Sequence, residues 1–191
     1  ARILFFPVKS VKGVFVYVTC PMVLNRFEAD VKLGDKDSFT LPTVDVGDEK
    51  CFVLVGNKNT IDNKNVVILE EYSFGIQKTE TKEFIKIPNL AIDEQRIVII
   101  SDDNFKHFVQ NSTEVITRIK INNETGTAQP GGLFTEEYLP AETIMYALAI
   151  GDTDKFINNT PTTLQIGGNS TLGKGIVELT IGVKEGAKNG D

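Results

Sequence analysis

The chain has 191 residues, which is enough for one domain with a hydrophobic core and too few for two independent domains to be expected. Its composition, 41% hydrophobic and 24% charged, is that of an ordinary globular protein, and no apolar run is long enough to cross a bilayer. A net charge of −6 argues against a general nucleic-acid binder, although a local basic cluster can act against the total. Because no signal peptide opens the chain, a soluble, cytoplasmic protein without a membrane partner is predicted.

The cysteines and the histidine argue against most metal and nucleophile chemistry. Cys20 and Cys51 lack the CxxC spacing of a zinc site, so both are expected to be buried, reduced thiols. A Ser-His-Asp triad would have to use His107, the single histidine, which is expected on the surface of a helix. No metal site is predicted from the residues of this chain.

The chain begins with strand-like sequence. Residues 2–8 and 13–18 are apolar and rich in β-branched and aromatic side chains, which predicts two strands. Thr19 then offers a cap, and Pro21 follows near the first helical position, so a helix is predicted from there to about residue 33. Its apolar face is formed by Val23 or Leu24, Phe27 and Val31.

Short β-like pieces follow the helix. They lie at residues 38–41, 52–55 and 66–76, and Asp, Asn, Lys and Gly residues separate them. The stretch 34–88 is therefore predicted to be an insertion region within a single domain that covers residues 1–191.

The second half alternates strands and helices. A strand over 96–101, a helix over 102–110 and a strand over 113–121 form a β-α-β pattern, with Ser101 or Asp102 as the helix cap. The capping interpretation also accounts for Asp102 and Asp103 better than metal binding does. Further segments are strands at 131–140 and 142–152, a short helix at 154–159 and a last strand at 175–184. With its helices packed on one face of the sheet, this order predicts an α+β fold of the ferredoxin-like kind with insertions.

A glycine-rich stretch near the end is close to a phosphate-binding P-loop. Residues 168–174 read GNSTLGK, which fits all but the last position of that motif. Gly175 stands where Mg²⁺ coordination needs Ser or Thr, and a strand follows instead of a helix whose N-terminus would face phosphates. Nucleotide hydrolysis is therefore disfavoured. A turn without ligand is one interpretation; the other is backbone binding of nucleic acid by an amide-rich loop that contains Gly167, Gly168, Gly173 and Lys174.

Three glutamates are candidates for acid-base or metal chemistry. Glu136 and Glu137 would point to opposite faces of a strand, so they cannot both serve one site without a bulge, and Glu142 follows nearby. Solvated or ion-paired carboxylates are the competing interpretation.

Four basic residues lie in or beside strands, namely Lys9, Lys12, Arg118 and Lys120. Alternation puts Arg118 and Lys120 on one face, which suggests a small basic ridge for a phosphate backbone. Exposed lysines at a sheet edge explain the same pattern nearly as well.

Three stretches in this order, residues 5–27, 122–146 and 164–177, resemble the RAMP-superfamily backbone subunit of type III-B CRISPR effectors, the fourth subunit of the Cmr complex. Residues 34–88 are the least alike. The resemblance implies a ferredoxin-like (RRM-like) core that polymerises head to tail along a CRISPR RNA, beside other Cmr subunits. It also implies a thumb-like hairpin at 124–132 that wedges between guide and target RNA.

The resemblance assigns roles to several residues. The closing loop, with Gly167, Gly168, Gly173, Lys174 and Gly175, would lie against the guide backbone, and the intact family member would cut target RNA with a divalent metal, Mg²⁺ or Mn²⁺. The family's cleavage aspartate lies in an N-terminal loop, so a truncated fragment is expected here. Glu136 and Tyr138 match positions near the cleavage centre.

The expected function is therefore an RNA-binding backbone subunit whose intact form is an endoribonuclease. Two rivals stay open: a scaffold that binds RNA and never cuts it, and a stand-alone nucleotide-binding enzyme, which the residue at the end of the P-loop-like stretch makes doubtful.

Overall fold

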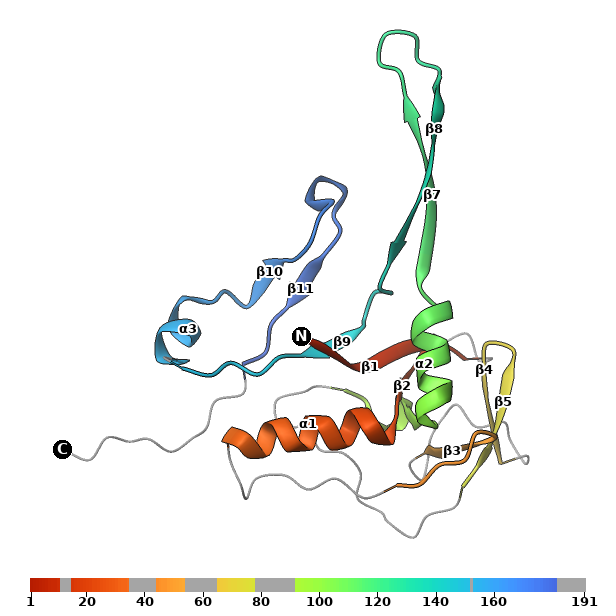
Figure 1. Ribbon diagram of the computed structural model, residues 1–191, viewed down its shortest axis with the longest axis vertical. Helices are drawn as coiled ribbons and strands as arrows, with labels where there is room; N and C mark the ends of the chain where they lie inside the picture. The colour runs from red at the N-terminus through yellow and green to blue at the C-terminus, as the bar shows by residue number, and fades with distance from the viewer. Residues whose placement is uncertain (11–14, 35–43, 54–64, 78–91, 152, 182–191) are drawn as a thin grey trace, which may run out of the picture.

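The computed structural model describes residues 1–10, 15–34, 44–53, 65–77, 92–151 and 153–181 (Figure 1). In these residues the main sheet has seven strands in the order β4-β5-β3-β6-β2-β1-β9. The strands are β1 (Arg2–Lys9), β2 (Phe15–Thr19), β3 (Lys50–Val53), β4 (Val66–Leu69), β5 (Tyr72–Ile76), β6 (Ile97–Ile99) and β9 (Ile144–Tyr146). The sheet is mixed, because β2 runs parallel to β6 while β1 and β3 run antiparallel to their neighbours β2 and β6. The predicted α+β class is confirmed, and the ferredoxin-like core stays a prediction.

The sheet has a hydrophobic core on each face, because successive side chains of a strand point to opposite sides. On one face, Phe6 and Val98 pack with Phe105 and Phe108 of α2 (Asp102–Asn111). On the other face, Tyr17, Phe52 and Ile97 pack with residues of α1 (Pro21–Gly34). The helix residues in that second core are Leu24 and Phe27.

The prediction that the helices cover one face of the sheet is therefore wrong. The reason lies in the strands themselves: five consecutive residues of β1, from Leu4 to Val8, are buried. A continuous apolar run of this kind is typical of a strand that is covered on both sides.

The helix caps connect the two helices. Ser101 caps α2, as predicted, by accepting a hydrogen bond from the Asn104 amide at 3.3 Å. Asp102 instead accepts from the amide of Met22, in the first turn of α1, at 2.9 Å. Asp102 therefore caps α1 through the amide of a residue that lies 80 positions earlier in the chain.

Two hairpins stand apart from the main sheet (Figure 1). β7 (Glu114–Ile121) pairs with β8 (Ala128–Tyr138), and this hairpin projects away from the body of the molecule. β10 (Thr163–Gln165) pairs with β11 (Ile176–Glu178) and rises on the same side. The predicted order of strand, helix and strand over 96–121 is confirmed, but the two strands do not form a β-α-β unit, since β6 belongs to the main sheet and β7 to the hairpin.

Several other predicted boundaries change. Residues 66–76 form two strands, because Glu70 adopts a left-handed φ of 52° and turns the chain between β4 and β5. The strand expected over 142–152 is only the short β9, and β10 was not predicted. The short helix is confirmed as α3 (Thr153–Asn159). Strand 38–41 and most of the stretch 34–88 lie outside the described residues, but β3, β4 and β5 come from that stretch and join the main sheet.

The predictions for the two cysteines and for the histidine agree with the structure. Cys20 and Cys51 are free thiols, and burial raises the pKa of each to about 12. His107 lies on the exposed side of α2, where its ring meets the edge of Tyr72. Within the described segments, no helix is both long and apolar enough to span a bilayer.

Candidate functional site

Polar side chains gather on one face of the β7–β8 hairpin, near its base. The register pairs Glu114 with Tyr138 and Ile116 with Glu136, so these residues share a face, and alternation adds Arg118 to it. Arg118, Glu136 and Tyr138 are half-buried, while most residues of the opposite face, such as Val115 and Leu133, are exposed. The two faces of the hairpin therefore differ, and the polar one faces the rest of the molecule.

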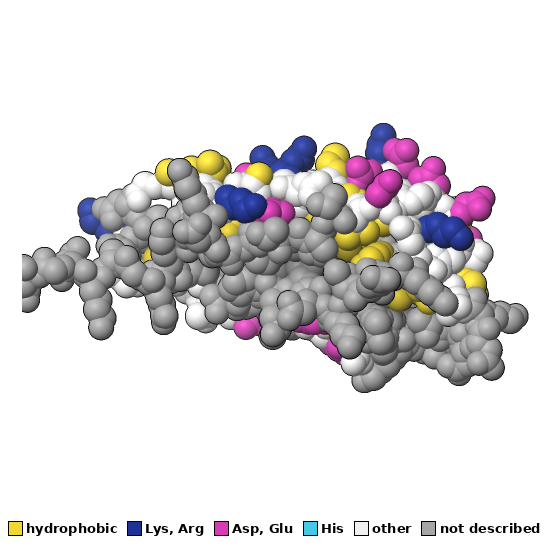
Figure 2. Space-filling model, turned by 90° about the horizontal axis from the view of Figure 1, so that it is seen from below, with side chains coloured by type: hydrophobic (Ala, Val, Ile, Leu, Met, Phe, Trp, Pro, Cys, Tyr) yellow, Lys and Arg dark blue, Asp and Glu magenta, His cyan; other side chains and the backbone are white. Residues whose placement is uncertain are grey.

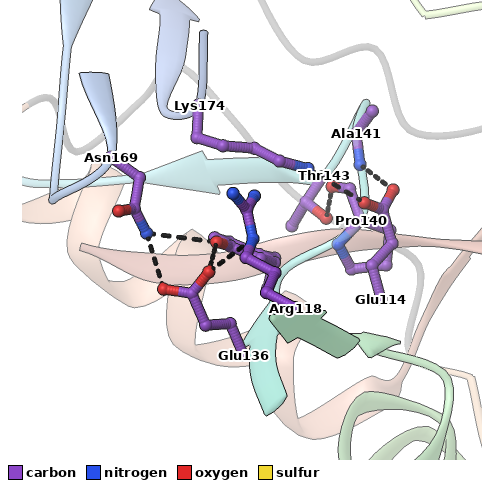
Figure 3. Close-up of polar contacts among 9 residues, drawn as sticks. Glu114, Arg118, Glu136, Pro140, Ala141, Thr143, Asn169 and Lys174 are labelled. Carbon is purple, nitrogen blue, oxygen red and sulfur yellow. Dashed lines mark hydrogen bonds and ion pairs between the residues drawn. The ribbon is translucent and has the colours of Figure 1, made fainter. Parts of the chain in front are cut away.

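The carboxylate of Glu136 is the centre of this cluster (Figure 3). Its Oε2 forms an ion pair with Nε of Arg118 at 2.7 Å and accepts a hydrogen bond from the Tyr138 hydroxyl at 2.7 Å. Its Oε1 accepts a hydrogen bond from Nδ2 of Asn169 at 3.1 Å. Both oxygens are thus engaged by three residues from two hairpins.

These contacts shift two pKa values in opposite directions. The pKa of Glu136 is lowered, first by the hydrogen bond from Tyr138 and then by that from Asn169. The pKa of Tyr138 is raised, chiefly because its hydroxyl donates to the Glu136 carboxylate. At neutral pH the pair is therefore a carboxylate and a neutral phenol.

Lys174 reaches the same cluster from the glycine-rich loop. Its Nζ lies 3.6 Å from Oε2 of Glu114 and 4.5 Å from the centroid of the Tyr138 ring (Figure 3). Glu114 also accepts a hydrogen bond from the amide of Ala141 at 3.3 Å, which fixes its carboxylate at the base of the hairpin. Lys174 is thus held by one carboxylate and one aromatic face.

The glycine-rich loop between β10 and β11 is itself tightly organised. Leu172 and Lys174 donate their amides to the Asn169 carbonyl at 2.9 and 3.3 Å. The side-chain amide of Gln165 contacts four carbonyl oxygens of the loop, those of Ile166, Gly167, Gly168 and Lys174. These hydrogen bonds stabilise the turn of the loop.

The glycines of the loop have different roles. Gly175 has a φ of +73°, and a Cβ there would lie 2.0 Å from the Ile166 carbonyl oxygen, so only glycine fits. The amide of Gly173 donates to Ser170 at 3.0 Å, so it is not available to a phosphate. Gly167, Gly168 and Gly173 all have open space where a Cβ would be. Because the Gly173 amide is already used, Gly167 and Gly168 are the two glycines of the loop that leave the backbone open to a ligand.

Arg118 retains donors for a ligand. Within the part of the chain that the structure describes, only its Nε is paired, with Glu136. Figure 3 shows the two terminal nitrogens of its guanidinium turned away from Glu136, toward the side on which Lys174 lies. The planar guanidinium can therefore bind an anion through these two groups without losing its ion pair.

The cluster is electrically balanced. Arg118 and Lys174 contribute two positive charges, and Glu114 and Glu136 contribute two negative ones. Figure 2 shows one face of the molecule, on which basic and acidic side chains are interspersed among the described residues. Any anion site must therefore arise from local geometry, because the net charge of −6 does not supply a basic surface.

The structure brings together four of the residues that the sequence singled out: Arg118, Glu136, Tyr138 and Lys174. Other candidates lie elsewhere. Lys9 is exposed at the far end of β1, and Lys120 is exposed beside the irregularity in the β7–β8 pairing. Lys12 lies outside the described residues.

The predicted separation of Glu136 and Glu137 is confirmed. Glu137 faces away from the cluster and accepts a hydrogen bond from the Thr113 hydroxyl at 2.6 Å. Glu142 accepts one from the Tyr17 hydroxyl at 3.3 Å, on the main sheet.

Sequence reasoning missed Glu114, Gln165 and Asn169. Glu114 could have been identified from the sequence, because strand alternation places it on the face of Arg118. Asn169 and Gln165 could not, since their roles depend on contacts that form only in the folded turn.

The described residues do not fit a bound divalent metal. Among them no group of three or more His, Cys, Asp or Glu side chains could hold a metal ion. Glu136, the most central carboxylate, is already engaged by a guanidinium, a phenol and an amide.

The chain combines a mixed sheet with a projecting hairpin and a glycine-rich loop that meets the base of that hairpin. Comparison with known proteins shows the family that has this architecture. The RAMP superfamily matches residues 4–178, and the chain belongs to this superfamily.

Particular relatives narrow the class. The chain is 40% identical over 211 aligned positions to the CRISPR system Cmr endoribonuclease Cmr4 of Pyrococcus furiosus, which covers all of this chain and 69% of the relative. The crystal structure of oligomeric Cmr4 from the same organism has a TM-score of 0.64 and 31% identity, covering 92% of this chain and 68% of that one. A subunit of the type III-B Cmr-beta complex bound to cognate target RNA shares the fold, with a TM-score of 0.66 at 20% identity over 93% of this chain and 67% of that one.

Proposed function

We propose that the chain is the Cmr4-type backbone subunit of a type III-B CRISPR effector, and that it binds the guide RNA backbone where the glycine-rich loop meets the β7–β8 hairpin. The observation that carries the proposal is the convergence of Arg118 and Lys174 on one face, beside the open backbone of Gly167 and Gly168. The Cmr4 relative of Pyrococcus furiosus, named as an endoribonuclease, supports the same assignment.

RNA binds at this site when a phosphate takes the place of a carboxylate beside Lys174. Arg118 keeps two free groups for a phosphate, and Lys174 can leave Glu114, whose contact at 3.6 Å is long and partly exposed. A phosphodiester between the two cations replaces Glu114 as the partner of Lys174, while Arg118 keeps its ion pair with Glu136, so no net basic surface is needed. Lys9, Lys12 and Lys120 belong to the proposal as further contacts along the RNA, at a distance from this cluster.

In the intact complex the subunit acts as an endoribonuclease that cuts complementary target RNA at regular intervals. Glu136 and Tyr138 lie at that centre in the proposal, as an ionised carboxylate and a neutral phenol. Because Glu136 is ionised at neutral pH, it orients Tyr138 and Arg118 and does not donate a proton. A divalent metal, Mg²⁺ or Mn²⁺, belongs to the intact activity, but no step through it is assigned to these residues.

The domain organisation, the partners and the location of the protein follow from the same proposal. Residues 1–191 act as one RAMP domain in which 34–88 is an insertion region. Its partners are guide and target RNA, other Cmr subunits and further copies of itself, as in the oligomeric Cmr4 structure. The protein works in the cytoplasm in this account.

The test is assembly of the full-length protein with guide RNA and its partner subunits, followed by addition of a complementary RNA and Mg²⁺. Evenly spaced cleavage products are expected, and omission of Mg²⁺ should abolish them. Guide RNA that fails to bind the full-length protein would overturn the proposal.

A second candidate is a scaffold that binds RNA and never cuts it. It is favoured by the lack of a metal-binding group of side chains among the described residues. Tight guide binding with a fully intact complementary RNA, under the same conditions, would select this alternative.

A further inference from the structure

Asn169 joins two hairpins that are distant in sequence. It lies in the glycine-rich loop with φ 63° and ψ 28°, a left-handed conformation, at the start of the short helical turn Ser170–Leu172. Its carbonyl accepts the amides of Leu172 and Lys174. The backbone of Asn169 therefore determines where the loop places Lys174.

The side chain of Asn169 binds the β7–β8 hairpin. It makes no capping hydrogen bond to its own helical turn. Instead its Nδ2 donates to Oε1 of Glu136 and to the hydroxyl of Tyr138, each at 3.1 Å and more than 30 residues away in the chain. Both hydrogens of the amide nitrogen are thus used on β8.

Asparagine suits this position better than glycine or aspartate. A left-handed φ is tolerated by glycine, asparagine and aspartate, and disfavoured for other residues. Glycine lacks the donor, and aspartate would place a second carboxylate beside Glu136. Asparagine alone combines the backbone conformation with two donors.

The position of the glycine-rich loop determines the position of the Lys174 ammonium group. Lys174 lies five residues after Asn169, and its Nζ is 4.5 Å from the Tyr138 ring centroid. A loop that is not fixed to β8 would carry Lys174 away from Tyr138 and from Arg118. The two cations then could not contact neighbouring phosphates together.

We infer that Asn169 is a positioning residue, whose side chain fixes the glycine-rich loop against Glu136 and Tyr138 so that Lys174 and Arg118 bind one RNA backbone. The inference rests on the proposed function for its ligand. Its geometric part, the fixing of the loop, concerns the protein without RNA.

The first test measures the loop in the full-length protein without RNA. Asn169→Gly keeps the left-handed backbone and removes the donor, so the amides of Leu172 and Lys174 should exchange with solvent at least about fivefold faster. Ser170→Ala changes the adjacent exposed side chain and should leave exchange unaltered. Equal exchange rates in Asn169→Gly and the parent protein would overturn the inference.

The second test measures guide RNA affinity. Asn169→Gly and Asn169→Asp should each weaken binding by about tenfold, with the thermal unfolding midpoint unchanged. Tyr138→Phe removes one acceptor of the Asn169 amide. The double variant Asn169→Gly/Tyr138→Phe should therefore lose less affinity than the product of the two single losses.

The outcomes separate the inference from the proposed function. If the parent protein binds no RNA, the proposed function fails, together with the RNA part of the inference. If the parent protein binds RNA and Asn169→Gly binds equally well, the inference alone is overturned. Losses that multiply in the double variant would assign Asn169 a role independent of Tyr138 and would contradict the coupling.

Discussion

Glu114 is the residue that competes with RNA for Lys174 in this account. Its Oε2 pairs with Lys174, while its Oε1 accepts the Ala141 amide. Glu114→Gln keeps an oxygen for that amide but removes the charge, so guide RNA affinity should rise by about threefold.

The control for this change is Glu71→Gln, which alters the net charge equally in the exposed turn between β4 and β5. Affinity should be measured by fluorescence anisotropy at fixed salt. Equal gains in the two variants would assign the effect to net charge and would contradict local competition.

Glu136 should titrate below its ordinary pKa of 4.5, because the folded state favours its ionised form. A lowered folded-state pKa adds stability that is complete above the unfolded-state pKa and is lost as the pH falls through the folded value. The carboxyl carbon shift of Glu136, followed by NMR from pH 6 to about pH 2, reports the titration.

Tyr138→Phe tests the cause of this shift, since the Tyr138 hydroxyl is the largest contributor. The pKa of Glu136 should rise toward 4.5 in that variant. An unchanged titration would mean that the hydroxyl does not stabilise the carboxylate.

At the residue scale the sequence revealed part of the site. Lys174 emerged because it stands in a stretch that nearly matches a P-loop, and Arg118 emerged from strand alternation. Glu136 emerged as one of three candidate glutamates and again, with Tyr138, from the family resemblance. Asn169 did not, because its significance comes from hydrogen bonds that span 33 and 31 residues. No local pattern encodes contacts of that range.

At the scale of elements, the β10–β11 hairpin depends on Gly175. Gly175→Ala should destabilise the protein by more than about 1 kcal/mol, because alanine disfavours a positive φ and its Cβ would meet the Ile166 carbonyl. Chemical denaturation of the full-length protein measures the change.

Gly47→Ala is the matched control, since Gly47 has an ordinary φ and nothing within 4 Å of an added Cβ. It should change the free energy of unfolding little. A Gly175→Ala protein as stable as this control would contradict the described geometry of the loop.

Element types were largely predictable, and element partners were not. The helix at Asp102–Asn111 follows from its Ser101 cap, and the helix at Pro21–Gly34 follows from Pro21 and its apolar spacing. The predicted Thr19 cap is wrong, because Thr19 is the last residue of β2 and its hydroxyl has no hydrogen-bond partner among the described residues. The two helices cover opposite faces because both sides of the sheet are apolar. The continuous apolar run in β1 could have predicted this. The pairing of β7 with β8 was predicted only through the hairpin that the family resemblance implies at 124–132, because local propensity does not determine the partner of a strand.

At the scale of the whole molecule, the order of three sequence stretches was enough to indicate the superfamily, and the match over residues 4–178 confirms it. Composition pointed the other way, since a net charge of −6 is unusual for an RNA binder. In the structure each cation of the site lies beside a carboxylate: the proposed RNA backbone displaces Glu114 from Lys174, whereas Arg118 stays paired with Glu136 and uses its two remaining donor groups.

The central claim, that the glycine-rich loop and the hairpin base bind an RNA backbone, is tested most directly by guide RNA affinity of the full-length protein over a series of salt concentrations. Lys174→Ala should weaken binding and reduce the slope of log affinity against log salt by about 1, while the cleavage rate at saturating RNA stays unchanged. Lys106→Ala, on the exposed side of α2, serves as the charge-matched control and should change neither quantity. The same affinity and the same slope in Lys174→Ala as in the parent protein would contradict the account.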